Sequence, residues 1–182
     1  MKILKITLIV LAFIGIVTIG GLWFVGYFSK FEIKEQQTGG YLLVGMDFIG
    51  PYMNVGPTMN AVDSVLRKSG IECNKGFGIY YDDPKKTPNE KCRSFVGNIL
   101  ENADSATINE IRNLGLKIDT LTTRQSSVIE WKISNPLSYM IGPMKVYPSF
   151  TKYLKDKTFT PELFIEVYDV PAKKIMYIMQ HN

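Results

Sequence analysis

The sequence predicts an α+β fold in which a strand-helix-strand-strand unit occurs twice about a pseudo-twofold axis, preceded by one transmembrane helix. Three observations support this prediction. No residue from Ile6 to Phe28 is charged. The segment Ile49-Gly50-Pro51 recurs as Ile141-Gly142-Pro143. Tyr81-Asp82 recurs as Tyr168-Asp169, and in both copies a proline follows two residues after the aspartate.

Length and charge exclude several classes of protein. The chain has 182 residues, enough for about one domain. Its formal net charge is +4, but two of its 21 basic residues, Lys2 and Lys5, lie next to the uncharged stretch, and the others nearly balance the 17 acidic residues. Phosphate binding needs a concentrated basic surface. We therefore expect no nucleic-acid partner.

The uncharged stretch is long enough to cross a membrane. As a helix with a rise of about 1.5 Å per residue, it exceeds a hydrocarbon core of roughly 30 Å. A cleaved signal peptide is the alternative, but its apolar region is shorter and ends at small residues, whereas this stretch ends in Trp23, Phe24, Tyr27 and Phe28. We expect an anchor over residues 1–29 that contacts the lipid bilayer through residues 6–28.

This anchor predicts a single-pass membrane protein, located in the endoplasmic reticulum membrane of a eukaryote or the inner membrane of a bacterium. Lys2 and Lys5 on one side, and Lys30 and Lys34 on the other, leave open which side the domain faces. The domain itself is predicted at 30–182, with halves at about 31–101 and 115–181.

The first half begins with an extended lead-in at 31–34 and a strand at 41–48. A helix follows, because Met59, Val62, Val65 and Leu66 fall on one face and Pro57 lies near its start. Strands are then expected at 78–82 and 92–100.

The second half repeats this order. A lead-in at 116–119 and a strand at 128–133 precede a helix whose buried face is Val146, Phe150, Tyr153 and Leu154, with Pro148 near its start. Strands follow at 164–169 and 174–179. Between the halves, 102–115 reads as a linker with a short amphipathic helix. The two small sheets are expected to join side by side with both helices on one face, leaving a groove or the opposite face for a ligand.

Cysteine and histidine are too scarce to support common site chemistries. Cys73 and Cys92 could form one disulfide outside the cytosol or be buried thiols inside it. His181 is the single histidine, so zinc ligation and Ser-His-Asp catalysis are not expected. We expect no metal and no cofactor.

Glu166 is the most informative carboxylate. In a strand, Leu163, Ile165 and Val167 point one way, so Phe164, Glu166 and Tyr168 point the other way. A carboxylate between two aromatic rings favours an organic cation. In the empty protein it should be protonated or meet a tyrosine hydroxyl or water. A solvent-exposed Glu166 is the alternative. By the repeat, its counterpart in the first half is Ile79.

Further candidates for the ligand-binding groove are aromatic. Trp131, between Glu130 and Lys132, faces away from both and suits a ligand wall or a core position. Tyr41, Tyr80 and Tyr139 complete the set of candidates. By contrast, Asp82-Asp83-Pro84 is a turn signal, and Arg93 is either an ion-pair partner of this loop or a surface residue.

The run YYDDPKKTPNEKCRSFVGNIL from Tyr80 to Leu100, the two Gly-Pro-led helices and ELFIEVYD from Glu162 to Asp169 resemble the GyrI-like small-molecule-binding domain of multidrug-responsive bacterial regulators. The chain is still more similar to testis-expressed reticulophagy-receptor-type proteins, which place one N-terminal membrane helix before such a domain. The resemblance covers Phe31 to Gln180. Those receptors continue into a long disordered acidic tail that carries their binding motif, whereas this sequence stops at Asn182. The domain match alone is therefore not expected to transfer the receptor function.

The resemblance implies that Glu166 meets cationic ligands, because Glu166 and Tyr168 match the E-x-Y pattern of the family on this strand. It implies a membrane-tethered domain that binds a small cationic or amphipathic molecule. The alternatives are a receptor or scaffold with a protein partner, and a hydrolase of electrophilic small molecules that uses Trp131 and Glu166 to place water. No DNA-binding segment precedes the domain, so a transcription regulator is not expected. We expect a binding protein rather than an enzyme.

Overall fold

The computed structural model describes residues 2–24, 26–101 and 103–182. Val25 in the predicted anchor and Asn102 at the start of the predicted linker lie outside these residues. The elements in chain order are α1 (Lys2–Phe24), β1 (Lys34–Thr38), β2 (Tyr41–Ile49), η1 (Tyr52–Asn54), α2 (Gly56–Lys68), β3 (Lys75–Tyr80), η2 (Asn89–Lys91), β4 (Arg93–Leu100), α3 (Ser105–Asn113), β5 (Lys117–Leu121), β6 (Arg124–Lys132), α4 (Ser138–Tyr153), η3 (Leu154–Asp156), β7 (Pro161–Asp169) and β8 (Lys174–His181).

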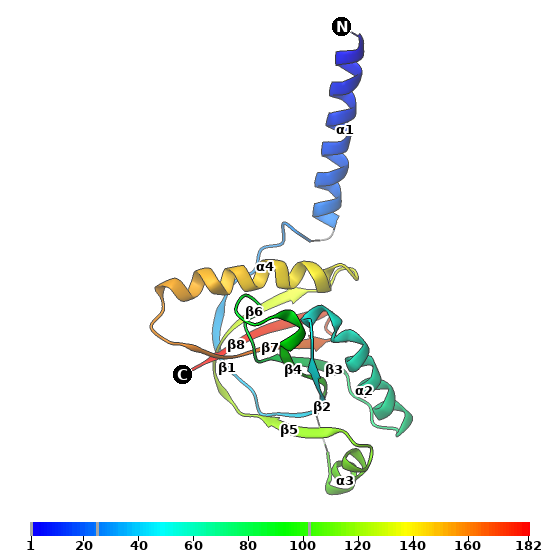
Figure 1. The fold of residues 1–182 in the computed structure, drawn as a ribbon, viewed down its shortest axis with the longest axis vertical. Helices are drawn as coiled ribbons and strands as arrows, with labels where there is room; N and C mark the ends of the chain where they lie inside the picture. The colour runs from blue at the N-terminus through cyan, green and yellow to red at the C-terminus, as the bar shows by residue number, and fades with distance from the viewer. Residues whose placement is uncertain (1, 25, 102) are drawn as a thin grey trace.

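Helix α1 projects from the rest of the molecule as a rod (Figure 1). Ile3–Phe24 is long and apolar enough to cross a membrane, and none of it is buried. The helix was expected to run to Phe28 but ends at Phe24. Gly26 explains the difference: at φ 77° it takes the left-handed conformation, while its N–H bonds to the Trp23 carbonyl and the Tyr27 N–H bonds to the Leu22 carbonyl. These two bonds form a Schellman motif.

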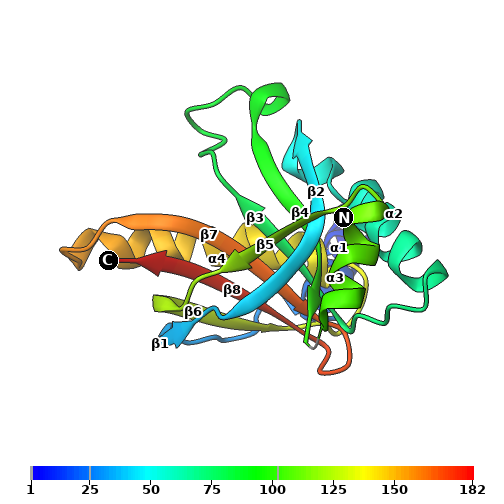
Figure 2. The same ribbon diagram turned by 90° about the horizontal axis from the view of Figure 1, so that it is seen from below.

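One eight-stranded antiparallel sheet holds both halves, in the order β1-β6-β8-β7-β3-β4-β2-β5. The predicted duplication is confirmed, because β2-α2-β3-β4 and β6-α4-β7-β8 occupy corresponding positions. Strands β3 and β7 pair at the centre, and the sheet curls around them (Figure 2). The first strand of each half is exchanged: β1 pairs with β6 and β5 with β2.

The two faces of the sheet have separate cores. One face carries a cluster that includes Leu43, Phe77, Phe95, Ile165 and Ile178. On the other face, α2 and α3 cover the first half with Val62, Leu66 and Ile111, and α4 covers the second half with Val146 and Phe150. Both long helices therefore lie on one face, as predicted.

The two Gly-Pro segments do not correspond, which corrects the sequence-based alignment. Gly50-Pro51 lies between β2 and η1, whereas Gly142 and Pro143 lie inside α4. Helix α4 begins earlier than predicted because Ser138 Oγ accepts hydrogen bonds from the N–H groups of Ser134 and Asn135, which closes the preceding turn. Pro148, expected near the helix start, is consequently in its interior. Strand pairing, not the Gly-Pro motif, defines the repeat.

The remaining local predictions concern the cysteines and the linker. Cys73 and Cys92 are both free and buried, so the disulfide alternative is not realised. The linker helix is present as α3, whose N-terminus is capped by Asp104 through a 2.8 Å hydrogen bond from the Thr107 N–H. Ile111 is its buried residue.

Candidate functional site

Glu166 lies on β7, at the centre of the helix-covered face. As predicted, Ile165 and Val167 pack into the cluster of the opposite face, while Phe164 and Tyr168 pack on the side of α4. The prediction that Ile79 is the first-half counterpart of Glu166 is wrong. Ile79 pairs with Ile165 and points to the opposite face, and the β3 residue that pairs with Glu166 is Gly78.

Three tyrosine hydroxyls donate to the Glu166 carboxylate. Tyr147 of α4 donates to Oε1 at 2.7 Å, and Tyr168 donates to Oε2 from two residues along the same strand. Tyr80 of β3 lies 3.4 Å from Oε2 and 3.4 Å from the Tyr168 hydroxyl. Glu166 is only 5% exposed. The expectation that this carboxylate meets a tyrosine hydroxyl is confirmed. We call Glu166 with Tyr80, Tyr147 and Tyr168 the tyrosine cage.

Burial dominates the electrostatics of the tyrosine cage. It raises the pKa of the Glu166 carboxyl above its ordinary value, and the tyrosine hydroxyls offset only part of that shift. Burial and the nearby carboxylate also hold the pKa values of Tyr80, Tyr147 and Tyr168 well above their usual range. The hydroxyls therefore remain protonated donors, and the carboxyl is the first group of the cage to ionise as pH rises.

Glycines on β3 make room for the cage. Gly76 pairs with Tyr168 and Gly78 with Glu166, so neither strand partner carries a side chain there. A Cβ at Gly78 would lie 2.7 Å from the Tyr80 hydroxyl. The Tyr80 side chain thus folds back over Gly78 to reach Glu166, a path that any larger residue at 78 would block.

Two further tyrosines cover the cage, one from each half. The Tyr139 ring, in the first turn of α4, lies 6.1 Å from the Tyr168 ring, and the Tyr52 ring of η1 lies 4.7 Å from the Tyr80 ring. These rings give the buried carboxylate an aromatic surround, and aromatic faces attract cations.

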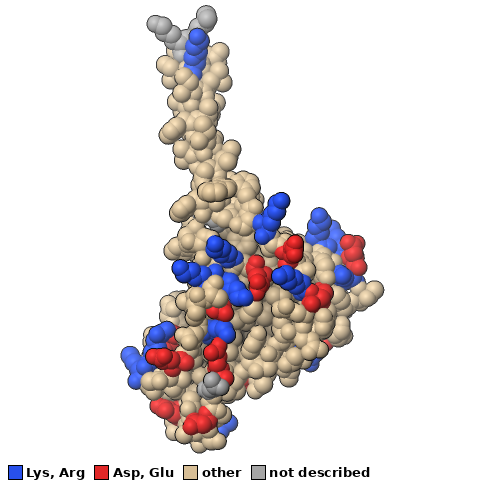
Figure 3. Space-filling view, turned by 180° about the vertical axis from the view of Figure 1, so that it is seen from behind, with Lys and Arg blue, Asp and Glu red and all other residues tan. Residues whose placement is uncertain are grey.

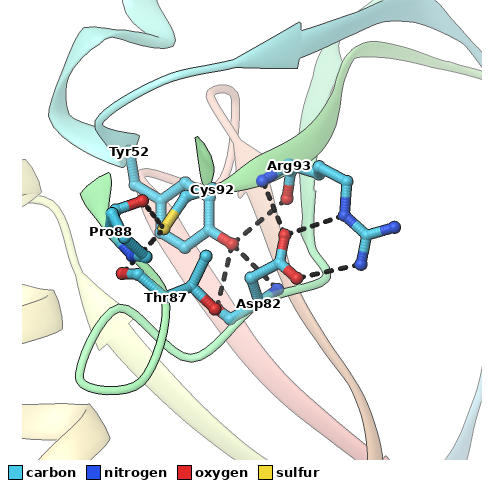
Figure 4. A network of polar contacts seen from close by, with 6 residues as sticks. All are labelled: Tyr52, Asp82, Thr87, Pro88, Cys92 and Arg93. Carbon is cyan, nitrogen blue, oxygen red and sulfur yellow. Dashed lines mark hydrogen bonds and ion pairs between the residues drawn. The ribbon is translucent and has the colours of Figure 1, made fainter. Parts of the chain in front are cut away.

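Tyr52 is held by the loop after β3 (Figure 4). Its hydroxyl lies 2.9 Å from the Asp82 carbonyl oxygen and 3.1 Å from that of Arg93, and it accepts a hydrogen bond from the Asp82 N–H. Burial raises the pKa of Tyr52 to about 12. Asp82 binds the Arg93 guanidinium through both oxygens, and Asp83 accepts from the Lys85 N–H. The predicted turn and the ion-pair reading of Arg93 are confirmed.

Trp131 lies at the far side of the same helix-sheet interface. It is 3% exposed and packs with Tyr177 and Phe150, while Glu130 and Lys132 point outward as predicted. Within the described residues, Trp131 Nε1 and the Tyr177 hydroxyl have no hydrogen-bond partner. Gly142 of α4 lies over both, because a Cβ there would be 2.3 Å from the Tyr177 hydroxyl and 3.3 Å from Trp131 Cδ1.

The structure therefore groups most of the predicted site residues and separates one. Tyr80 and Tyr168 contact Glu166 directly, Tyr139 lies against Tyr168, and Phe164 packs against Tyr147. Trp131 belongs to the same apolar cluster as Phe164. Tyr41 packs against the cluster of the opposite face. That face has a shallow hollow of about 310 Å³, lined by residues that include Ile79, Arg124 and Glu162 but not Glu166.

Sequence reasoning missed Tyr52, Tyr147, Tyr177 and Gly78. The sequence carried a signal for Tyr177, because alternation along β8 puts it on the sheet face opposite to Ile178. Tyr147 follows the predicted buried Val146, but helical periodicity does not show that its hydroxyl reaches a strand. The importance of Gly78 depends on the pairing of β3 with β7, which no local pattern specifies.

Comparison with curated proteins gives a limited match. No family model matches the chain. It is 28% identical over 99 residues to the testis-expressed protein 264 homolog of Mus musculus and 25% identical over 99 residues to testis-expressed protein 264 of Homo sapiens. Each match covers 52% of this chain and 32% of the relative. The chain therefore matches about a third of the length of these relatives.

Solved structures resemble the fold over most of the chain. SAV2435, solved bound to tetraphenylphosphonium, has a TM-score of 0.54 and 15% identity, covering 83% of this chain and 94% of that one. The C-terminal domain of EcmrR has a TM-score of 0.53 and 9% identity, covering 84% and 98%. A putative transcription regulation protein from Staphylococcus aureus MU50 has a TM-score of 0.50 and 13% identity, covering 83% and 98%. At these identities the likeness concerns the fold alone, and that fold is the GyrI-like one expected from the sequence.

Proposed function

We propose that residues 30–182 form a domain that binds a lipophilic organic cation at Glu166, and that residues 1–29 tether this domain to a membrane. The observation that carries the proposal is the tyrosine cage: one desolvated carboxylate, enclosed by aromatic side chains, on the central strand of the sheet. Charge attracts the cation to Glu166, and the ring faces of Tyr80, Tyr139 and Tyr168 bind its apolar groups.

The ligand class follows from the chemistry of the cage. A small hydrated cation would keep its water and gain little from the aromatic rings. A bulky cation with aryl groups has little hydration to lose, and its aryl groups can pack against the rings. The fold neighbour SAV2435 was solved with such a molecule, tetraphenylphosphonium, which supports the same ligand class here.

The cage is closed by its own side chains, so binding requires movement. Tyr80 is the side chain we expect to move. Its hydroxyl has the longer 3.4 Å contacts, whereas Tyr147 is held at 2.7 Å from Oε1. Displacing Tyr80 uncovers the side of Glu166 that faces Gly78, where no side chain occupies the space.

The test is Glu166→Gln in full-length protein reconstituted in nanodiscs, titrated with tetraphenylphosphonium by calorimetry. The amide keeps the shape and removes the charge. We expect affinity to fall by roughly 1 to 3 kcal/mol, the range for a charged hydrogen bond. The uncharged analogue triphenylphosphine oxide should lose little. Glu162→Gln is the matched control, because Glu162 is on the same strand but bonds to Arg124 in a partly exposed ion pair.

Equal tetraphenylphosphonium affinity in wild type and Glu166→Gln would sink the cation site. Glu166 would then be a structural residue, and a scaffold that binds a protein partner would become the leading function. Loss of affinity in Glu162→Gln as large as in Glu166→Gln would show that the general charge of the sheet, not the cage, attracts the ligand.

Tethering has a separate test. Full-length protein in membranes should resist alkaline extraction, because Ile3–Phe24 of α1 is a continuous apolar helix and none of this span is buried against the domain. Sequencing of the mature N-terminus completes the test. A mature chain that begins after Phe28 would make α1 a signal peptide and leave the cation site unaffected.

A further inference from the structure

The outward face of α4 is apolar at the end nearest α1. Its inward residues, Ser138, Gly142, Val146 and Phe150, recur every four positions and are buried. On the opposite side Leu137, Met140 and Met144 are 48%, 55% and 67% exposed. Their spacing places them on one face. We call these three residues the α4 stripe.

An ordinary surface helix would be polar at such positions, and α2 in the first half is. Its exposed residues include Asn60, Ser64 and Arg67. Since α2 and α4 occupy corresponding places on the same face of the sheet, the fold itself does not require apolar residues on the outside of α4. The α4 stripe therefore needs a separate explanation.

Hydrogen bonds fix the α4 stripe beside the end of α1. Asn135 Nδ2 donates to the Phe24 carbonyl at 3.0 Å, and Lys145 Nζ donates to the carbonyls of Tyr27 and Ser29, the latter at 3.0 Å. The Lys145 ammonium also lies 5.3 Å from the centre of the Tyr27 ring. Figure 1 shows α4 running across the domain directly below the end of α1.

The aromatic residues at the end of α1 indicate the depth of the α4 stripe. Trp23 is 75% exposed, and tryptophan and tyrosine collect at the headgroup level of spanning helices. Lys145, bonded to the Tyr27 carbonyl, is the neighbour of Met144 in the chain. The stripe is thus at the level that Trp23 and Tyr27 would occupy. In Figure 3 the shaft of α1 is free of charged side chains between the blue side chain near its N-terminal end and the domain, where charged side chains begin again.

Lysines accompany the apolar residues. Lys152 and Lys155 are exposed towards the far end of α4, and Lys30 is exposed in the segment that follows α1. An apolar stripe with lysines around it is the pattern of a helix that lies in the plane of a membrane interface, where anionic headgroups attract the lysines.

We propose that the α4 stripe lies in the headgroup region of the bilayer that α1 crosses. This inference rests on the proposed tether. It places α4 on the lipid surface lengthwise, with Tyr139 of its first turn against Tyr168 of the tyrosine cage. The same helix then contacts lipid on one side and covers the cation site on the other, so a lipophilic cation dissolved in the bilayer meets the domain at its binding site.

The test measures the depth of α4 in full-length protein reconstituted in vesicles of phosphatidylcholine and phosphatidylglycerol. An environment-sensitive dye is attached at Met144→Cys and, as the matched control, at Ser64→Cys on the outward face of α2. Cys73 and Cys92 are buried, so unsubstituted protein gives the labelling background. We expect the dye at 144 to emit at shorter wavelength, to be quenched by nitroxide lipids and to be protected from iodide. The dye at 64 should behave as in water.

Alkaline extraction of the same vesicles separates the two proposals. Protein that is retained but carries an iodide-quenched dye at 144 would overturn the membrane contact and leave the tether standing, whereas extracted protein would overturn the tether itself. A dye at 144 shielded from both iodide and nitroxide lipids, in protein that crosslinks as a dimer, would assign the α4 stripe to a second copy and overturn the lipid contact.

Discussion

The two halves of the sheet share one order of strands and one helix position, but they differ where they meet. On the helix-covered side, β3 presents Gly76, Gly78 and Tyr80, and the paired positions of β7 present Tyr168, Glu166 and Phe164. One half supplies empty space and the other supplies the ionisable group with its aromatic neighbours. A symmetric pair would have placed two carboxylates face to face or none at all. The difference shows how a duplicated fold obtains a single central site: one copy loses its side chains where the other gains them.

The helices of the two halves also differ in packing, because Gly142 of α4 lies tightly against Tyr177 whereas Gly56 of α2 has open space around it. Gly142→Ala tests this difference and should have the largest effect. The new Cβ would lie 2.3 Å from the Tyr177 hydroxyl, in a closely packed interface. We expect the free energy of unfolding to fall by about 1 to 3 kcal/mol, as for other overpacked cores, measured by urea denaturation. Gly56→Ala in α2 is the control, since no atom lies within 4 Å of its Cβ. It should be neutral or slightly stabilising.

A double substitution checks the cause of the Gly142→Ala effect. Tyr177→Phe removes the hydroxyl oxygen that the new Cβ meets, so it should restore part of the lost stability in the Gly142→Ala background. If Gly142→Ala and Gly56→Ala had equal effects, the two helices would pack alike and the comparison between the halves would fail at this level.

The empty space on β3 is tested by Gly78→Ala. A Cβ at 78 meets the Tyr80 hydroxyl at 2.7 Å, and it would fill the space beside Glu166 that the movement of Tyr80 opens to the ligand. We expect tetraphenylphosphonium affinity to fall about tenfold, the size of one hydrogen bond or aromatic contact. In Gly76→Ala the nearest side-chain atom is Met59 Cε at an ordinary 3.5 Å, so affinity should change little. An equal loss in both variants would assign the effect to the strand backbone instead of the space beside Glu166.

The charge of Glu166 predicts a pH dependence of binding. Burial raises the pKa of its carboxyl, so the charged form appears only at a pH above the ordinary range for glutamate. Tetraphenylphosphonium carries a fixed charge, and its affinity should therefore rise with pH through the raised pKa of Glu166. Calorimetric titration between pH 4 and 8 measures this. The Glu166→Gln affinity should be flat, and a wild-type affinity that falls as pH rises would contradict the assignment.

The smallest expected effect concerns stability. Because the folded-state pKa of Glu166 is raised, the folded protein binds a proton at pH values where the unfolded chain has released it. This contribution to stability is complete below the ordinary glutamate pKa and is lost as pH rises through the raised one. The Tm of Glu166→Gln relative to wild type should consequently increase with pH. A Tm difference that decreased with pH would mean that the carboxylate is better stabilised in the cage than in water.

The sequence predicted what depends on periodicity and not what depends on pairing. Alternation along β7 placed Glu166 correctly between Phe164 and Tyr168, and the buried face of α4 at Val146 and Phe150 followed from helical spacing. The pairing of Glu166 with Gly78 could not be predicted, since the register between strands from different halves is set by the whole sheet. The Gly-Pro repeat misled the alignment because a three-residue match carries no information on strand register.

One consequence of the exchanged strands is mechanical. The chain leaves α1 and enters β1, an edge strand that pairs with β6 over 34–38. A force between the membrane and the domain first reaches the bonds of Phe24 to Asn135 and of Ser29 to Lys145 of α4, and then β1. Glu35 holds β1 at that point by accepting from Tyr153 at 2.8 Å and pairing with His181 at 3.0 Å. Tension on the tether is thus transmitted into the second half, which supplies Glu166, Tyr147 and Tyr168 of the cage, before it reaches β2 and the rest of the first half.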